Sequence, residues 1–174
     1  RLAQLGLVEH ARYHGVQLTD AGRRVALEML RHHRLLETFL VEALGYKWDQ
    51  VHEEAERLEH VISERFEERI AEVMGHPTHD PHGDPIPAPD LSLPSVDSSM
   101  PLHDLPVGFR GRLVRVGSQD PDNLSLLRRL GLAPGCMVEV LSEEQRGTRV
   151  RVGKDRFLLP TYLAETLWME GLKQ

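Results

Sequence analysis

The chain has 174 residues, 40% of them hydrophobic and 28% charged, with a formal net charge of -6. This length can bury a real core as one domain or two small ones. Apolar stretches stay well short of the ~20 residues that cross a bilayer, and a negative chain is a poor candidate for gripping nucleic acid with its whole surface. The chain opens on no signal peptide pattern, and its single cysteine, Cys136, excludes an internal disulfide. We therefore expect a cytoplasmic protein without a membrane segment.

The first 45 residues predict a small hairpin and a long helix. Two short strands are expected at 7–9 and 16–18, around a turn at His14. A helix follows, capped by Thr19 or the residue after it and stopped by Gly45.

Two helices carry metal-ligand types on one side. The next helix is predicted from about Asp49 to Ile62, and at about 100° per residue four of its side chains fall within an arc of roughly 100°. These four are His52, Glu56, Glu59 and His60; on the preceding helix His33 and Glu37, four apart, share a face. Imidazoles with carboxylates suit manganese or ferrous iron better than thiolate-seeking metals. Taken alone, the acidic helix is more typical of a solvated, salt-bridged surface.

The rest of the chain changes character twice. Ser63 is predicted to cap a further helix that Gly75 closes. Residues 76–106 hold 8 of the 11 prolines and predict a linker. Beyond them, short strands are expected at 113–116, 137–141, 150–152, 157–159 and 166–169, with a brief helix capped by Asp120 between the first two. Five short strands in so small a segment predict a barrel.

Successive motifs carry a family resemblance. They are RLAQLGLVE at 1–9, LTDAG at 18–22, RHHRLLE at 31–37, VHEEAERLEHV at 51–61, GDPIP at 83–87, LGLAPG at 130–135 and VEVL at 138–141. In this order and spacing the chain resembles the diphtheria-toxin-repressor family of metal-dependent transcriptional regulators. The last two motifs resemble the FeoA-type, SH3-like domain of its longer members.

The resemblance implies an α+β protein in four parts. Residues 1–20 would be the end of the recognition helix and the wing, near His10 and His14, of a winged helix-turn-helix. Residues 21–75 would be the helical metal-binding and dimerisation domain, 76–106 a proline-rich linker and 107–174 the SH3-like β-barrel. The earlier part of the winged helix-turn-helix is absent from this chain, so no base-contacting residues are assigned.

The resemblance also implies two metal sites. Glu56, Glu59 and His60 match the primary, regulatory site. The ancillary site would comprise His33, Glu37 and His52, with two oxygen ligands from the barrel, aligned with Asp120 and Asn123. For Asp120, capping the following helix is the rival explanation. Where iron-responsive members have cysteine, this chain has Glu56, and a harder ligand favours Mn²⁺, with Fe²⁺ as the alternative.

The function expected is a manganese-responsive repressor of metal-homeostasis genes that binds operator DNA as a homodimer. The alternatives are a ferrous-iron repressor of the same family and a metal-binding adaptor without a DNA target. A metallohydrolase is disfavoured, because the sequence shows no nucleophile, phosphate loop or oxyanion donor.

Several other residues are predicted to be structural. His76, His79 and His82 recur every third residue among prolines, with no cysteine nearby, and are interpreted as plain surface histidines. Cys136 is expected to be a small core residue, and Trp48 and Trp168 to be packing anchors.

Overall fold

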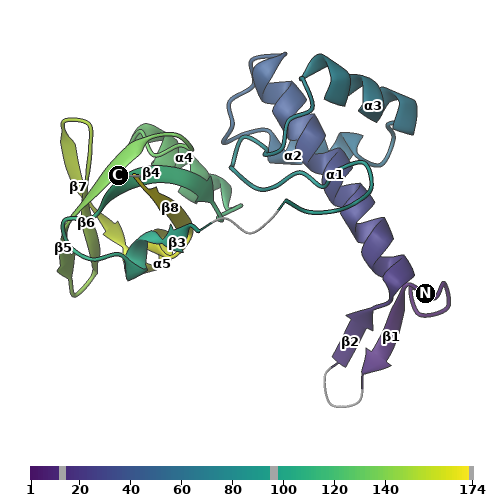
Figure 1. The fold of residues 1–174 in the computed structure, drawn as a ribbon, viewed down its shortest axis with the longest axis horizontal. Helices are drawn as coiled ribbons and strands as arrows, with labels where there is room; N and C mark the ends of the chain where they lie inside the picture. Colours follow the sequence, from purple (N-terminus) through teal and green to yellow (C-terminus); the bar gives the residue numbers. More distant parts are fainter. Residues whose placement is uncertain (12–14, 95–97, 173–174) are drawn as a thin grey trace.

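A computed structural model describes residues 1–11, 15–94 and 98–172 and shows a helical unit beside a β unit (Figure 1). The predicted α+β class is confirmed. The predicted turn and wing residue His14 lies outside the described residues. Within them, no helix has the length and apolar character needed to span a membrane.

The predicted hairpin and long helix are present. Strands β1 (Val8–Ala11) and β2 (Gly15–Leu18) pair antiparallel, and α1 (Asp20–Glu42) follows. The Thr19 hydroxyl caps α1, accepting the backbone N–H of Gly22 at 3.1 Å. A Cβ at Gly22 would lie 1.9 Å from the Leu7 carbonyl oxygen, so glycine is required where the hairpin meets the helix.

The second predicted helix is shorter than expected. It forms α2 (His52–Leu58), and α3 (Glu64–Val73) begins after the Ser63 cap. Beyond Leu58 the chain continues as a turn, in which the backbone N–H groups of Val61 and Ile62 both donate to the Leu58 carbonyl. The predicted end of this helix near Ile62 is therefore wrong, and His60 lies beyond the helix that was expected to carry it.

The first part of the predicted linker is packed onto the helices. Ile86 is buried in the same cluster as Leu35, Leu36 and Leu40 of α1. Arg31 joins α1 to both neighbours: its Nε pairs with Glu67 of α3, and its Nη1 donates to the Pro87 carbonyl at 2.6 Å. The segment after α3 is thus held against α1 before the chain enters the β unit.

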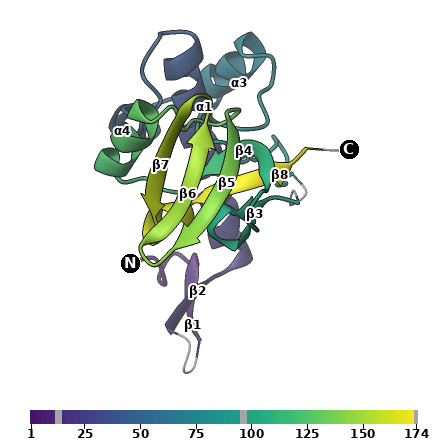
Figure 2. The same ribbon diagram turned by 90° about the vertical axis from the view of Figure 1, so that its left-hand side faces the viewer.

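The β unit is a curled antiparallel sheet around an apolar core (Figure 2). Its strand order is β3-β8-β4-β5-β6-β7. The five predicted strands are present, with one more at the start. The strands are β3 (Met100–Pro101), β4 (Arg110–Val116), β5 (Met137–Glu144), β6 (Gly147–Val152), β7 (Asp155–Pro160) and β8 (Leu167–Gly171), and the helices are η1 (Leu102–Asp104), α4 (Pro121–Arg129) and α5 (Thr161–Ala164). Trp48, although it comes from the helical unit, packs against this core as an anchor, and so does Cys136.

Candidate metal centre

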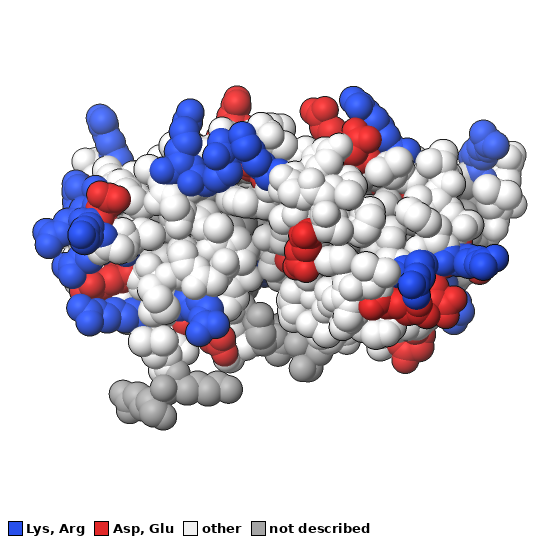
Figure 3. Space-filling model, turned by 90° about the horizontal axis from the view of Figure 1, so that it is seen from above, with Lys and Arg blue, Asp and Glu red and all other residues white. Residues whose placement is uncertain are grey.

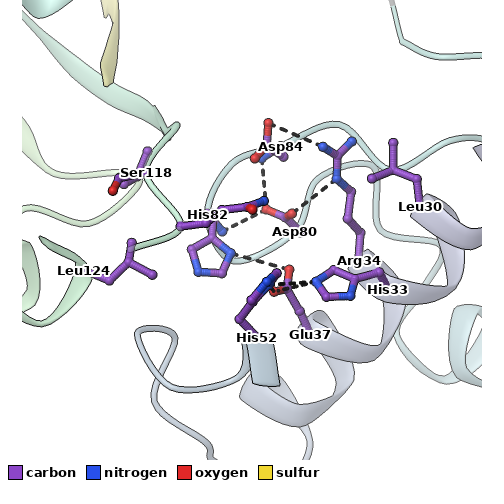
Figure 4. A pocket seen from close by; sticks show the side chains of 12 residues that line it. Leu30, His33, Arg34, Glu37, His52, Asp80, His82, Asp84, Ser118 and Leu124 are labelled. Carbon is purple, nitrogen blue, oxygen red and sulfur yellow. Dashed lines mark hydrogen bonds and ion pairs between the residues drawn. The ribbon is translucent and has the colours of Figure 1, made fainter. Parts of the chain in front are cut away.

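Three side chains from α1 and α2 converge in a first trio, His33, Glu37 and His52 (Figure 4). The i, i+4 spacing on α1 puts His33 Nε2 3.1 Å from Glu37 Oε1. At the start of α2, His52 Nδ1 lies 3.0 Å from His33 Nε2 and 3.3 Å from Glu37 Oε1. Three ligand atoms therefore meet around one point, with the Glu37 side chain only 3% exposed.

A second trio, Glu37, Asp80 and His82, shares Glu37 with the first. Glu37 Oε2, its other oxygen, lies 3.5 Å from His82 Nδ1. Asp80 is held in place because its Oδ1 accepts the backbone N–H groups of His82 and Asp84, at 2.8 and 2.9 Å. One buried carboxylate thus faces two ligand groups at once.

His82 corrects a prediction. It is 7% exposed and lies among metal-ligand types, so its interpretation as a plain surface histidine is wrong. Asp80 was missed altogether. The available signal was position, since both residues lie within the three positions before the GDPIP motif, whose Ile86 is buried against α1.

The pKa values show how strongly these groups interact. Burial would raise the pKa of Glu37, but hydrogen bonds from His33 and His82 outweigh it and lower that pKa to about 2. Burial would lower the pKa values of His33 and His82, yet both are raised by hydrogen bonding and charge from Glu37. Burial, with the charge of Glu37, raises the pKa of Asp80 to about 6. The Glu37 carboxylate therefore favours the protonated imidazoles of His33 and His82. A metal ion would have to displace these protons in order to bind the same nitrogen atoms.

The donor set fits a divalent ion. Both trios offer only imidazole nitrogen and carboxylate oxygen, the ligands preferred by manganese and ferrous iron. The surrounding side chains leave a cavity of about 30 Å³, room for one small ion or water. The barrel closes one side of this cavity with Val116, Ser118, Gln119 and Leu124.

The structure brings only one of the three predicted regulatory ligands to the first trio. Glu59, the residue that caps α2, places Oε2 2.7 Å from His33 Nδ1. His60 is exposed and lies 3.5 Å from the other Glu59 oxygen. Glu56 is exposed on α2.

Asp120 and Asn123 do not join the trios. Asp120 is exposed, and its Oδ1 accepts the Asn123 backbone N–H at 2.9 Å, as the N-cap of α4. The Asn123 side chain donates to the Ser118 hydroxyl. The polar barrel residues that reach the cavity are instead Ser118 and Gln119, just before the cap. The requirement to cap α4 accounts for the position of Asp120.

Comparisons with known proteins match both units. Residues 19–88 match the family described as "Iron dependent repressor, metal binding and dimerisation domain", and residues 100–171 match the FeoA domain. The iron-dependent repressor IdeR of Mycobacterium tuberculosis (strain ATCC 25618 / H37Rv) is 32% identical, over 98% of this chain and 79% of its own length. The diphtheria toxin repressor of Corynebacterium diphtheriae is 31% identical, over 99% and 80%.

Solved structures are similar over the same length. A "manganese-dependent transcriptional repressor complex with manganese" has 40% identity and a TM-score of 0.89, covering 98% of this chain and 80% of that one. The manganese regulator SloR has 28% identity and a TM-score of 0.82 with the same coverage. The chain therefore belongs to the family of metal-dependent transcriptional repressors that includes IdeR and the diphtheria toxin repressor. It is a regulator, not an enzyme, as predicted.

Proposed function

We propose that this chain is the sensing part of a manganese-responsive repressor that binds operator DNA as a homodimer and controls metal-homeostasis genes. The proposal depends mainly on the position of Glu37. This buried carboxylate belongs to both trios and turns one oxygen toward the other members of each. Such a centre is costly to assemble from its own charges and is stabilised by a divalent cation.

Ligand hardness supports manganese over iron. The trios contain no sulfur, and Cys136 packs against the barrel core. Glu56 adds a carboxylate to the proposed regulatory site, and selectivity for manganese must come from hard ligands and geometry, because manganese is lowest in the divalent affinity order. Two similar solved structures are titled manganese-dependent repressors, each 40% identical to this chain.

We assign Glu56, Glu59 and His60 to the regulatory site and the first trio to a supporting one, extended by Asp80 and His82. The 2.7 Å contact between His33 Nδ1 and Glu59 Oε2 links the two. A ligand of one site thereby orients a ligand of the other, which is how outer contacts tune metal centres.

The proposed mechanism follows from the elements that carry these ligands. α1, α2 and the loop of Asp80 and His82 each contribute part of the centre, so these elements must come together for it to form. A divalent cation would supply the positive charge that offsets the clustered carboxylates. The β1–β2 hairpin, the proposed wing, projects from the start of α1 away from the barrel (Figure 1). The long α1 thus connects the proposed DNA-contacting end to the centre. To activate the repressor, the metal ion needs only to bind the DNA-competent arrangement more tightly than the other arrangement.

The homodimer is supported by exposed apolar side chains around α3. Val61, Phe66 and Val73 are 48–75% exposed, within the region matched to a dimerisation domain. A two-fold dimer would set the spacing of two DNA-reading units against operator half-sites. Light scattering at micromolar concentration with manganese should give twice the 19.8 kDa chain mass. A monomer under those conditions contradicts this part of the proposal.

The metal choice is tested by anaerobic titration of operator binding by the intact protein with manganese and ferrous ions. We expect the parent to respond better to manganese, and Glu56→Cys to shift the response toward ferrous iron. Glu53→Cys, on the exposed side of the same helix, is the matched control. The relatives named iron-dependent repressors favour the ferrous alternative. A parent that responds better to ferrous iron would establish that alternative.

A further inference from the structure

Two ion pairs join the helical unit to the barrel. Arg128 of α4 places Nε 2.8 Å from Asp49 Oδ2, and the Asp49 side chain is only 1% exposed. Arg115 of β4 lies 3.8 Å from Asp84, with its guanidinium 4.1 Å from the centre of the Trp168 ring. Asp84 belongs to the loop that carries the second trio, and Asp49 adjoins the Trp48 anchor.

Backbone contacts seat the barrel directly on that loop. The N–H of Val116 donates to the His82 carbonyl at 2.8 Å. A Cβ at Gly83 would lie 1.9 Å from the Val114 carbonyl oxygen, so only glycine allows β4 this close. His82, which faces Glu37, is therefore attached to the barrel by its own backbone carbonyl.

Trp48 holds the same histidine from the other side. Its carbonyl lies 2.9 Å from His82 Nε2, and its ring meets the His82 ring edge-on at 5.6 Å. Because a carbonyl only accepts, Nε2 carries the proton, and in the neutral imidazole Nδ1 then presents a lone pair toward Glu37. The Trp48 ring also packs against the barrel core. Docking of the barrel and orientation of His82 thus depend on the same short segment.

The charges of the two units are complementary. Residues 1–99 hold eighteen Asp and Glu against ten Lys and Arg, whereas 100–174 hold nine against eleven. Blue side chains gather at the barrel end in Figure 3. Opposite net charge favours docking, and the buried Asp49 carboxylate depends on it most.

We propose that Arg128 and Asp49 form a latch that docks the barrel and, through Trp48 and His82, positions the second trio for its cation. Both are positioning residues and not ligands. The inference rests on the proposed metal-sensing function. Because coupling between two events is reciprocal, a cation at the second trio must strengthen docking by the factor by which docking strengthens cation binding.

The two members of the latch should not be equivalent. Removing Arg128 leaves the Asp49 carboxylate buried without a counter-charge, whereas removing the charge of Asp49 leaves Arg128, 37% exposed, in contact with water. Arg128→Gln should therefore weaken docking more than Asp49→Asn does.

The test is calorimetric titration of the full chain with Mn²⁺. Arg128→Gln should bind about 5- to 20-fold more weakly than the parent, and Arg128→Lys, which keeps the charge, should recover most of the loss. Arg129→Gln is the matched control: it removes the same charge from the same helix, at an exposed residue that forms no ion pair within the described part of the chain. It should match the parent.

Small-angle scattering supplies a second measurement that a ligand role would not move. Without metal, Arg128→Gln should have a larger radius of gyration than the parent, and saturating Mn²⁺ should restore the parent value. Parent-like affinity in Arg128→Gln, within twofold, overturns the latch, as does an equal loss in Arg129→Gln. If the parent itself binds no Mn²⁺, the proposed function fails and the latch fails with it.

Discussion

The two units differ in what they bury. Within the described residues, the barrel core contains fifteen buried apolar side chains, while its buried polar residues are only Ser118 and Thr148. The helical unit has eight buried apolar residues and as many buried polar or charged ones. The latter are Arg31, His32, Glu37, Thr38, Asp49, Glu67, Asp80 and His82. Burial of apolar side chains is therefore enough to drive folding of the barrel, whereas the buried charged groups of the helical unit need partners of opposite charge.

The helical unit also exposes apolar side chains within the region matched to a dimerisation domain. Around α3 these are Val61, Phe66 and Val73, which are 48–75% exposed. This contrast in buried polar groups is consistent with the proposal that the helical unit is completed by a cation, a partner copy and the docked barrel. Substitutions in the two units should therefore respond differently to metal.

The largest effect on stability is expected in the barrel. Leu113→Ala opens a cavity at a side chain that is fully buried in the core. It should cost about 2–5 kcal/mol, and added manganese should not recover that loss in chemical denaturation. Leu172→Ala, at an exposed leucine of the same unit, is the control. Full recovery by manganese would contradict the independence of the barrel core.

Glu37→Gln should have the largest effect on metal binding. It keeps the shape but removes the one carboxylate shared by both trios, so manganese affinity should fall by more than about 100-fold. Stability without metal should also fall at neutral pH, because the lowered pKa of Glu37 shows that the folded state favours its ionised form, which the amide cannot adopt. Calorimetry of this variant beside Glu42→Gln, an exposed glutamate of the same helix, measures the effect. A site of parental affinity in Glu37→Gln would refute the shared ligand.

Acid should weaken metal binding from an unusually high pH. Cation binding needs neutral imidazoles, and the raised pKa values of His33 and His82 keep them protonated above the ordinary 6.5. As the pH falls further, Asp80, whose pKa is about 6, also becomes protonated, whereas Glu37, whose pKa is about 2, stays ionised. Affinity should fall about tenfold per pH unit for each proton displaced, between roughly pH 7.5 and 5.5. Calorimetry across that range would show a constant affinity if these groups are not ligands.

Without metal, the histidines and Glu37 change the free energy of unfolding in opposite directions as the pH rises. The histidine contribution is fully present below pH 6.5 and is lost as the pH rises through their raised pKa values. The Glu37 contribution is present above pH 4.5 and is lost as the pH falls toward 2. Glu37→Gln should flatten both limbs of the profile in metal-free denaturation experiments, because Glu37 is the partner of both imidazoles.

The smallest effect separates capping from coordination. Asp120→Ala removes the N-cap of α4 and should cost about 1 kcal/mol, with manganese affinity unchanged. Asp122→Ala, exposed in the first turn of the same helix, is the comparison. A clear loss of manganese affinity in Asp120→Ala would return this residue to the ligand set.

Local signals predicted most of the elements. Thr19, Ser63 and Asp120 cap the helices that they were expected to cap, and the strands follow the β-rich runs, because capping and alternation act over a few residues. The four-residue spacing likewise placed His33 and Glu37 on one face. Only the resemblance separated His52 from the other ligand candidates of its helix and assigned it to the pair on α1, since no local rule relates α1 to α2.

By itself, the sequence determined which residues cap, pair and share a helix face, because those interactions span a single turn or hairpin. Only the tertiary structure decided that α2 ends at Leu58, that Gln119 and not Asp120 reaches the cavity, and that Asp80 and His82 lie beside Glu37 in the candidate centre. Periodicity is lost among the prolines of 76–106, so no repeat marks these two residues. Their position depends on Glu37, Trp48 and the barrel strand β4, which contact the loop from distant parts of the chain.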